Sequence, residues 1–236
     1  MMLLFFAVPE EARPFVRAWE RATGDRARKT VPPGAAWAPR FDFSGLRVQV
    51  TGMGAANARR SAEAALAGEH PDFVVTSGLA GGLDPALRTG DLVFDADDGF
   101  PRTEAFRRAS ARAGRFVQVE RVAASVAAKA QLRRDTGADA VDMESAAIRD
   151  VCRARGIPGA TLRVISDPAD EDVPLDFGGL VTADGRLDHG KLARALLRSP
   201  GKIPALVRLW KSVERASARL AEALVDVLSA PRRRPR

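Results

Sequence analysis

Acidic residues follow three apolar runs of this sequence, and their positions give the first indication of chemistry. Glu11 comes soon after the apolar run that opens the chain, and Asp142 and Glu144 close a second run. Asp167 follows a third run, at 160–165. If these runs are strands of an open α/β sheet, their carboxyl ends lie where such sheets bind ligands. Carboxylates in one crevice can cleave a glycosidic bond, because one activates water and another protonates the leaving group.

A ribosyl bond to a nitrogenous base would suit the same carboxylates. The base leaves more easily when its ring nitrogen is protonated, and nearby negative charge stabilises the cationic ribosyl group that develops. The alternative is that Glu11 and Glu144 lie in the first turns of helices, where acids interact favourably with the helix dipole. That alternative explains each residue taken alone, whereas three acids after three strands favour a shared site.

Apolar runs of strand length alternate with helical patterns along the chain. Strands are expected at 3–8, 41–43, 46–51, 73–76, 92–94, 116–123, the run closed by Asp142, and 160–165. Helices are expected at 10–21, after the TGMG step, at 103–113, 129–134, after Glu144, and at 191–197 and 204–228. The segment 23–39, rich in Gly, Pro and basic residues, is expected to be a loop.

This alternation predicts an α/β fold with a central mixed, largely parallel twisted sheet flanked by helices. No internal repeat or Ser/Gly-rich linker divides the chain, so 1–236 is expected to be a single domain. Within it, 199–236 would add a C-terminal helix and a basic tail that ends in PRRRPR. The apolar stripe of that helix is expected to pack on the core, and a partner or membrane contact is the alternative.

Composition excludes several classes of protein. The net charge is +7, but the sequence has no Tyr and few aromatic residues among its basic ones. The stacking platform of a single-strand binder is therefore missing, and nucleic acid is not an expected partner. The single cysteine, Cys152, excludes an intrachain disulfide and a multi-cysteine zinc site. It falls in a helical pattern and is expected to be a buried structural thiol, and neither a metal nor a cofactor is expected.

Neither a membrane span nor a signal peptide is expected. The opening MMLLFFAV is short and lacks a basic leader, so it is interpreted as a strand. No apolar run is long enough to cross a bilayer. The protein is therefore expected to be cytoplasmic.

Glycines gather at three strand ends, at Gly52 and Gly54, at Gly78, and at Gly81 and Gly82. Glycine lets the backbone approach a ligand closely and leaves N–H groups free to hold anions or hydroxyls. None of these clusters matches the GxGxxG fingerprint of dinucleotide-binding folds or the GxxxxGK[ST] phosphate loop. The sequence therefore lacks the signatures of dinucleotide and ATP sites.

Five motifs carry a resemblance to a known family: AVPEEA, TGMGAANA, SGLAGGLDPALRTGDLV, AVDMESAA and LRVISDPAD. In their order and spacing the chain resembles the nucleoside phosphorylase/nucleosidase superfamily, specifically the methylthioadenosine/S-adenosylhomocysteine nucleosidase branch. The resemblance covers most of the chain. It implies hydrolysis of the N-glycosidic bond of a 5′-substituted adenine nucleoside.

On the sugar side, the resemblance implies that Glu11 activates the attacking water. Met143 and Glu144 would hold the ribose, Glu144 through the sugar hydroxyls. Asp142 stands where the nucleosidases usually have Glu. The phosphorylase branches carry a Gly-x-x-x-Arg phosphate motif in the N-terminal loop, and this sequence has none there. Phosphorolysis remains the alternative reaction.

On the base side, the resemblance implies that Asp167 drives protonation at purine N7 and accepts from the exocyclic amine. Ser166 and Arg163 would support Asp167, and Phe177 would stack near the base or sugar. Asp at position 167 suits adenine, because branches that act on 6-oxopurines usually carry Asn there.

Two departures from the family pattern concern substrate contacts. Leu79 stands where the nucleosidases usually have Ser, next to Ala80 and Gly81, which would line the crevice. The segment between Asp95 and Val141 is also shorter than in the nucleosidases, and the missing part normally carries base-stacking residues. No base-stacking pair can be assigned from the sequence.

The tail and central motifs look more like the hopanoid-associated phosphorylase subgroup, whose members are thought to remove adenine from an adenosylated lipid. A shorter segment would leave the 5′ side open to a bulky apolar group, and the basic C-terminal helix could contact a membrane surface. Lineage drift is an equal alternative. The relatives imply a homo-oligomer, most simply a dimer, and a small-molecule adenine nucleoside as ligand. A non-catalytic nucleoside-binding protein is the remaining alternative.

Overall fold

The computed structural model describes residues 1–31, 38–174, 182, 190–191, 201 and 203–229. Within these residues the strands are β1 (Met2–Phe6), β2 (Arg28–Thr30), β3 (Arg40–Phe43), β4 (Leu46–Val50), β5 (Phe73–Gly82), β6 (Leu92–Ala96), β7 (Arg112–Ala113), β8 (Phe116–Gln118), β9 (Ala140–Asp142) and β10 (Gly159–Asp167). The helices are α1 (Pro9–Thr23), α2 (Ala55–Ala65), α3 (Thr103–Arg108), α4 (Val126–Thr136), α5 (Ser145–Arg153) and α7 (Ile203–Ser229).

All these strands belong to one mixed sheet, which confirms the predicted α/β fold. The main path runs β2-β3-β4-β1-β5-β10-β6-β7, and β9 pairs with β5 and with β8. The central strands β4, β1, β5 and β10 are mutually parallel. Strands β3, β6 and β9 pair antiparallel with β4, β10 and β5 respectively. The parallel part of the sheet is therefore its centre.

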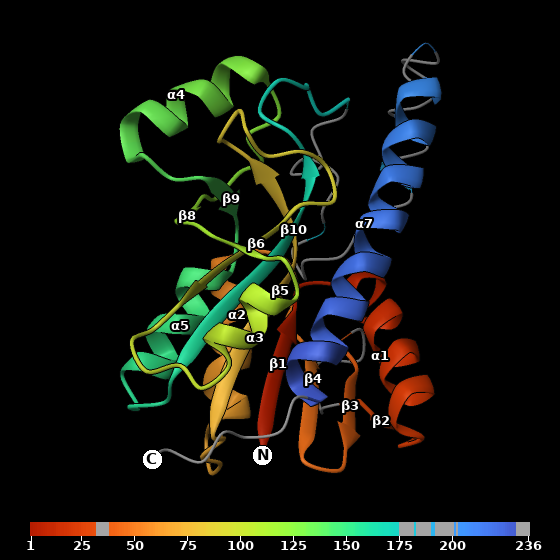
Figure 1. Cartoon of the computed structure of the whole chain (residues 1–236), viewed down its shortest axis with the longest axis vertical. Helices are drawn as coiled ribbons and strands as arrows, with labels where there is room; N and C mark the ends of the chain where they lie inside the picture. Colours follow the sequence, from red (N-terminus) through yellow and green to blue (C-terminus); the bar gives the residue numbers. More distant parts are fainter. Residues whose placement is uncertain (32–37, 175–181, 183–189, 192–200, 202, 230–236) are drawn as a thin grey trace.

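Helices cover both faces of the sheet (Figure 1). On one face α1 and α7 lie side by side, with α3 near α7; on the other, α2 packs against α5. Strand β1 is apolar throughout because it serves both faces. Leu4 and Phe6 join the core beneath α1 and α7, whereas Leu3 and Phe5 join the core beneath α2 and α5.

Local sequence explains where α1 begins and ends. Pro9 stands in its first turn, where the missing N–H costs nothing, and Glu10 and Glu11 follow in the same turn. Gly24, with φ of 72°, ends the helix in the left-handed conformation. The first turn of α1 thus presents Glu11 directly after β1.

Several predicted bounds are wrong, and most of the errors concern short strands. The segment predicted as a loop contains β2, which pairs with β3. The helix predicted at 103–113 ends at Arg108 and is followed by β7, and the strand predicted at 116–123 ends at Gln118. These two- and three-residue strands exist through pairing with neighbours, which local periodicity does not encode. The helix predicted at 191–197 lies outside the described residues, apart from Lys191.

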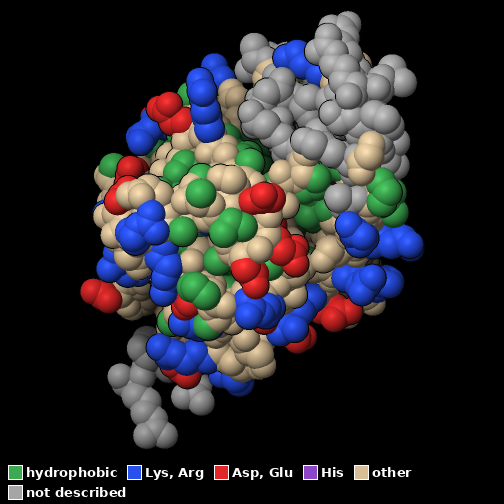
Figure 2. All heavy atoms as spheres, turned by 90° about the horizontal axis from the view of Figure 1, so that it is seen from above, with side chains coloured by type: hydrophobic (Ala, Val, Ile, Leu, Met, Phe, Trp, Pro, Cys, Tyr) green, Lys and Arg blue, Asp and Glu red, His purple; other side chains and the backbone are tan. Residues whose placement is uncertain are grey.

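The exposed surface mixes both signs of charge. In the view of Figure 2, Lys and Arg side chains are interspersed with Asp and Glu, and hydrophobic side chains lie between them. Among the described residues, no helix combines the length and apolar character needed to span a bilayer. The described part of the chain also holds no group of three His, Cys, Asp or Glu side chains placed to bind a metal ion.

Candidate active site

Glu11 is held against the middle of strand β5. Its Oε1 accepts a hydrogen bond from the Leu79 N–H at 3.0 Å. Its Oε2 is enclosed and has no hydrogen-bond partner among the described residues. Burial raises the pKa of Glu11, and Arg163 and backbone N–H groups oppose the rise. One oxygen of this carboxylate is therefore fixed by the backbone, and the other is buried without a hydrogen-bond partner among the described residues.

Gly78 makes the close approach of Glu11 possible. A Cβ at position 78 would lie 2.7 Å from Glu11 Oε2 and 2.8 Å from Arg163 Nη1, and the φ of Gly78 is +136°. Any side chain here would both clash and strain the backbone. The glycine cluster noted in the sequence thus has a specific role at this position.

Arg163, which is 2% exposed, gathers the remaining acids around it. Its Nη2 lies 2.7 Å from Asp142 Oδ2 and 3.6 Å from Glu144 Oε2, and its Nη1 donates to the Leu79 carbonyl at 3.3 Å. Glu144 Oε1 accepts from the Gly54 N–H at 2.8 Å. Burial raises the pKa of Asp142, and it raises that of Glu144 to about 7; Arg163 opposes both rises. Three carboxylates therefore share one guanidinium in a site largely closed to water.

The route by which Glu144 reaches this site differs from the prediction. The prediction placed Glu144 and Asp167 at the carboxyl ends of two like-directed strands. Strand β9 instead runs antiparallel to β5, with Val141 opposite Gly81, whereas β10 runs parallel to β5. Glu144 consequently lies beside Arg163, which is a residue in the middle of β10. Asp167 is the last residue of that strand.

Asp167 belongs to a second group of contacts, further along β5. Ser166 Oγ donates to Asp167 Oδ1 and also lies 3.2 Å from the Ala80 carbonyl oxygen. A Cβ added at Gly81 would lie 3.2 Å from Asp167 Oδ2. Lys129 Nζ lies 2.7 Å from the same oxygen. Consecutive residues of β5, from position 78 to 81, therefore contact both groups of the site.

The structure thus brings together most of the predicted residues, in two adjoining groups. Arg163, expected to support Asp167, instead contacts Asp142 and Glu144 of the first group. Met143, between Asp142 and Glu144 in the sequence, is half-buried, and Phe177 lies outside the described residues. Lys129 was missed by sequence reasoning, which used it only to mark a helix. The available signal was a single lysine among alanines in the sequence SVAAKAQ, inside the shortened segment between Asp95 and Val141.

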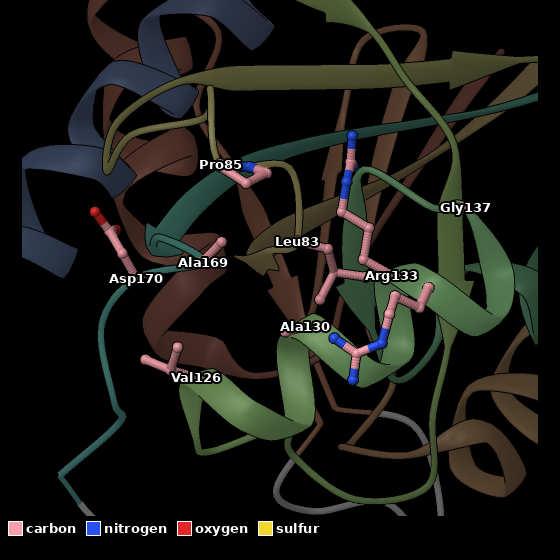
Figure 3. A pocket seen from close by; sticks show the side chains of 9 residues that line it. Leu83, Pro85, Val126, Ala130, Arg133, Gly137, Ala169 and Asp170 are labelled. Atoms are coloured by element: carbon pink, nitrogen blue, oxygen red, sulfur yellow. The ribbon is translucent and has the colours of Figure 1, made fainter.

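A larger cavity, of about 570 Å³, lies beside these groups rather than on them. It is bounded by α4, the turn after β5 and the loop after β10 (Figure 3). Val126 and Ala130 of α4 face Leu83 and Ala169 across it. None of the clustered carboxylates lines this cavity, so size alone does not identify the chemical site.

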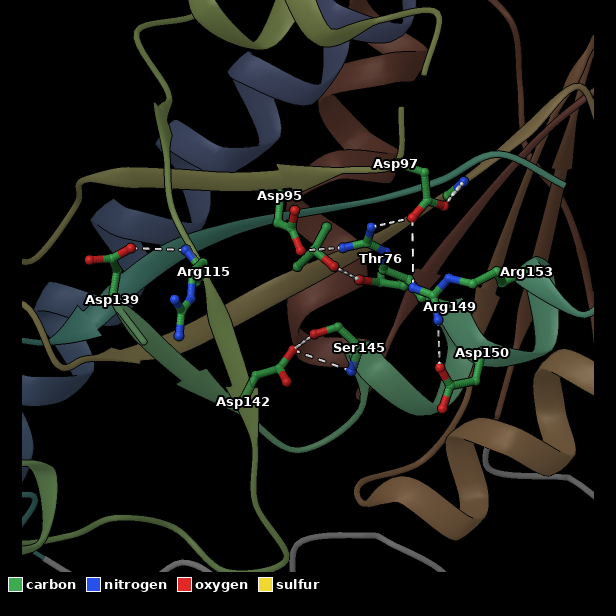
Figure 4. Close-up of polar contacts among 12 residues, drawn as sticks. Thr76, Asp95, Asp97, Arg115, Asp139, Asp142, Ser145, Arg149, Asp150 and Arg153 are labelled. Atoms are coloured by element: carbon green, nitrogen blue, oxygen red, sulfur yellow. Dashed lines mark hydrogen bonds and ion pairs between the residues drawn. The ribbon is translucent and has the colours of Figure 1, made fainter. Parts of the chain in front are cut away.

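Ion pairs and hydrogen bonds hold helix α5 against the residues of the sheet next to the site (Figure 4). Arg149 of α5 pairs with Asp95 and Asp97, and Asp142 accepts from the Ser145 N–H and hydroxyl at the start of the same helix. These contacts fix α5, whose first residue follows Glu144. Cys152 lies in α5 and is fully buried, and burial raises the pKa of its thiol to about 12. The interpretation of Cys152 as a buried thiol is confirmed.

Comparison with known proteins shows which families this chain is similar to. Residues 95–198 match the family model described as the phosphorylase superfamily. A 5′-methylthioadenosine/S-adenosylhomocysteine nucleosidase of Shewanella sp. (strain W3-18-1) is 26% identical over 149 residues. That alignment covers 49% of this chain and 64% of the relative, which is less than two thirds of its length.

Solved structures agree over nearly the whole chain. A 5′-methylthioadenosine/S-adenosylhomocysteine nucleosidase from Neisseria meningitidis, in complex with methylthio-immucillin-A, gives a TM-score of 0.69 at 19% identity and covers 96% of this chain and 97% of that one. The futalosine hydrolase of Helicobacter pylori strain 26695 gives 0.67 at 18% identity, with 97% of both chains covered. The resemblance to the nucleosidase branch is confirmed in fold and in sequence.

Proposed function

We propose that this protein hydrolyses the N-glycosidic bond of a 5′-substituted adenine nucleoside and releases adenine. The observation that carries the proposal is the Glu11 carboxylate. One of its oxygens is fixed by the Leu79 N–H, and the other is enclosed beside an acidic cluster without a hydrogen-bond partner among the described residues. A base held in this way can take a proton from water as the water attacks the ribosyl carbon.

The charge balance favours the expected transition state. Glu11, Asp142 and Glu144 surround the single guanidinium of Arg163. Negative charge beside the sugar would stabilise a ribosyl cation, and Glu144 would accept from sugar hydroxyls. Asp167, with Ser166, would direct protonation at purine N7 and accept from the exocyclic amine.

The same balance disfavours phosphate as the nucleophile. Arg163 is the guanidinium nearest these acids, and its two Nη atoms already contact Asp142, Glu144 and the Leu79 carbonyl. A phosphate dianion entering here would meet carboxylates without a free cation among the described side chains of the cluster. Hydrolysis is therefore preferred to phosphorolysis.

The 5′ substituent is proposed at the level of a class. The similar proteins are named for different substrates, a methylthioadenosine/S-adenosylhomocysteine nucleosidase and a futalosine hydrolase, so they do not select one 5′ group. A lipid-linked adenosine such as adenosylhopane is the alternative supported by the motifs of the tail and centre. A panel of methylthioadenosine, S-adenosylhomocysteine, 5′-deoxyadenosine and a lipid-linked adenosine would rank them by kcat/KM.

The decisive experiment measures adenine release in phosphate-free buffer by the wild type, Glu11→Gln and Glu10→Gln. Glu10 is the matched control, because it is the exposed neighbour of Glu11 in the same helical turn. Glu11→Gln is expected to lose about 10²- to 10⁴-fold in kcat, and Glu10→Gln to stay near wild type. Release that strictly requires phosphate, with ribose 1-phosphate as product, would establish a phosphorylase. Binding of nucleosides without turnover by any form would establish a non-catalytic binder.

We also propose a cytoplasmic homodimer with a peripheral membrane contact through α7. Trp210 is 69% exposed and Val207 48% exposed, and Arg208, Lys211 and Arg215 are spaced along the same part of the helix. Apolar and cationic side chains together suit an anionic lipid surface. Co-sedimentation with phosphatidylserine vesicles would test the membrane contact, and the Trp210→Ala variant should no longer co-sediment.

Analytical ultracentrifugation would test the proposed dimer.

A further inference from the structure

Lys129 of α4 is fully buried, with 0% exposure, and its ammonium group has three partners. Nζ lies 2.7 Å from Asp167 Oδ2, 2.7 Å from the Pro168 carbonyl oxygen and 2.8 Å from the Glu171 carbonyl oxygen. An ammonium group has three N–H donors. All three are thus used, and Lys129 has none left to offer to a ligand.

Fold stability alone gives little reason for this lysine. Burying an ammonium group costs about as much as an ion pair returns, and an apolar side chain of similar volume is often as good. The first residue of α4 and the segment just before the helix are also held to the loop after β10, by two other hydrogen bonds. The Val126 N–H donates to Asp172 Oδ1 at 2.7 Å, and the Val173 N–H donates to the Ala124 carbonyl at 2.7 Å.

The hydrogen bonds of Asp167 show what the lysine can do. Lys129 holds Oδ2, and the Ser166 hydroxyl donates to Oδ1. That hydroxyl has one proton and a second acceptor, the Ala80 carbonyl at 3.2 Å. When it turns to Ala80, Oδ1 becomes free to meet a purine, while Oδ2 stays fixed by the ammonium group.

We propose that Lys129 is a positioning residue, which acts on the base only through Asp167 and presents Oδ1 of that carboxylate to it. This inference rests on the proposed function, because it assigns Lys129 a part in recognising and releasing adenine. Its effect belongs to the step in which the base leaves, since an oriented carboxylate matters most in the transition state. Loss of Lys129 should therefore lower kcat more than it raises KM.

The test compares Lys129→Met and Lys129→Gln with Ser125→Ala, using methylthioadenosine as substrate and thermal unfolding as a second measurement. Ser125 caps α4 through Ala128 N–H and does not touch Asp167, so its variant weakens the helix without changing the carboxylate. Lys129→Met is expected to lose about 100-fold in kcat with KM within about threefold, and Ser125→Ala to keep wild-type kcat. Lys129→Gln, which keeps N–H donors but no charge, should lose at least about 10-fold in kcat and carries the test if Lys129→Met does not fold.

Four results would overturn the inference. Lysine variants with kcat within about threefold of wild type, or Ser125→Ala losing as much kcat as they do, would make Lys129 merely structural. A rise in KM alone would place its effect on ground-state binding. A wild-type protein that releases no adenine from any nucleoside of the panel would overturn the proposed function as well.

Discussion

Replacing Glu144 by Gln is expected to flatten the pH dependence of the free energy of unfolding. Burial raises the pKa of Glu144 from 4.5 to about 7, with Arg163 opposing the rise. A rise of this size corresponds to about 3 kcal/mol. The Glu144 carboxyl group binds a proton more tightly in the folded state than in the unfolded chain. The stability that this protonated carboxyl group contributes is therefore fully present below pH 4.5 and is lost as the pH rises through about 7.

The Gln variant removes this titration while keeping the local contacts. An amide oxygen can still accept from the Gly54 N–H, which donates to Glu144 at 2.8 Å, and Arg163 keeps Asp142 at 2.7 Å. Between about pH 5 and pH 8 the variant should lose about 2 kcal/mol less stability than the wild type. Glu63→Gln is the control, because Glu63 is exposed on α2.

Urea unfolding at constant ionic strength, at several pH values across that range, measures the difference directly. The wild type and Glu63→Gln should show the same decline, and Glu144→Gln a shallower one. Parallel declines in all three proteins would show that Glu144 does not titrate abnormally, and the electrostatic account of the acidic cluster would then be wrong.

Three further outcomes are expected. Gly78→Ala should lose at least about 10-fold in kcat, measured by adenine release, because its Cβ would displace Glu11; full activity would show that β5 yields here. Cys152 should resist iodoacetamide in the native protein and react only on unfolding, as followed by mass spectrometry, and rapid native labelling would contradict its burial. Arg149→Met should destabilise the fold by about 1 kcal/mol in urea unfolding, because Asp95 and Asp97 lose an ion-pair partner but stay partly exposed to water; an unchanged free energy of unfolding would refute that reasoning.

Much of the fold could be predicted because the local pattern of apolar and polar residues indicates its main helices and strands. The apolar run before Glu11 and the helical stripe after Pro9 each fit one element. Strand β5 was placed correctly but proved longer, continuing through the glycines to Gly82. Glycines weaken a strand pattern in the sequence, whereas pairing with β10 and β9 extends it in the structure. The single-domain assignment over 1–236 stays a prediction.

The site was predictable in its members more than in its geometry. Glu11 and Glu144 were named from motifs, and both lie beside Arg163. Their arrangement depends on the direction of β9, which periodicity cannot give, because an apolar run has the same pattern in either direction. The contact of Lys129 with Asp167 could not be predicted for a similar reason. Its other partners, Pro168 and Glu171, lie about forty positions away in the chain, and both accept through backbone carbonyls, which leave no mark in the sequence.

The packing of α7 on α1 has a consequence for biosynthesis. Among the α7 side chains that the structure describes, the buried ones lie between Ala216 and Leu228, and they complete the same core as Phe15 and Trp19 of α1. About 180 residues separate the two helices in the chain. At a translation rate of about 5–20 residues per second, the apolar face of α1 leaves the ribosome on the order of 10 to 40 s before α7, which covers it, is synthesised. During that interval the nascent chain presents an uncovered aromatic surface, which is the kind of segment that chaperones bind.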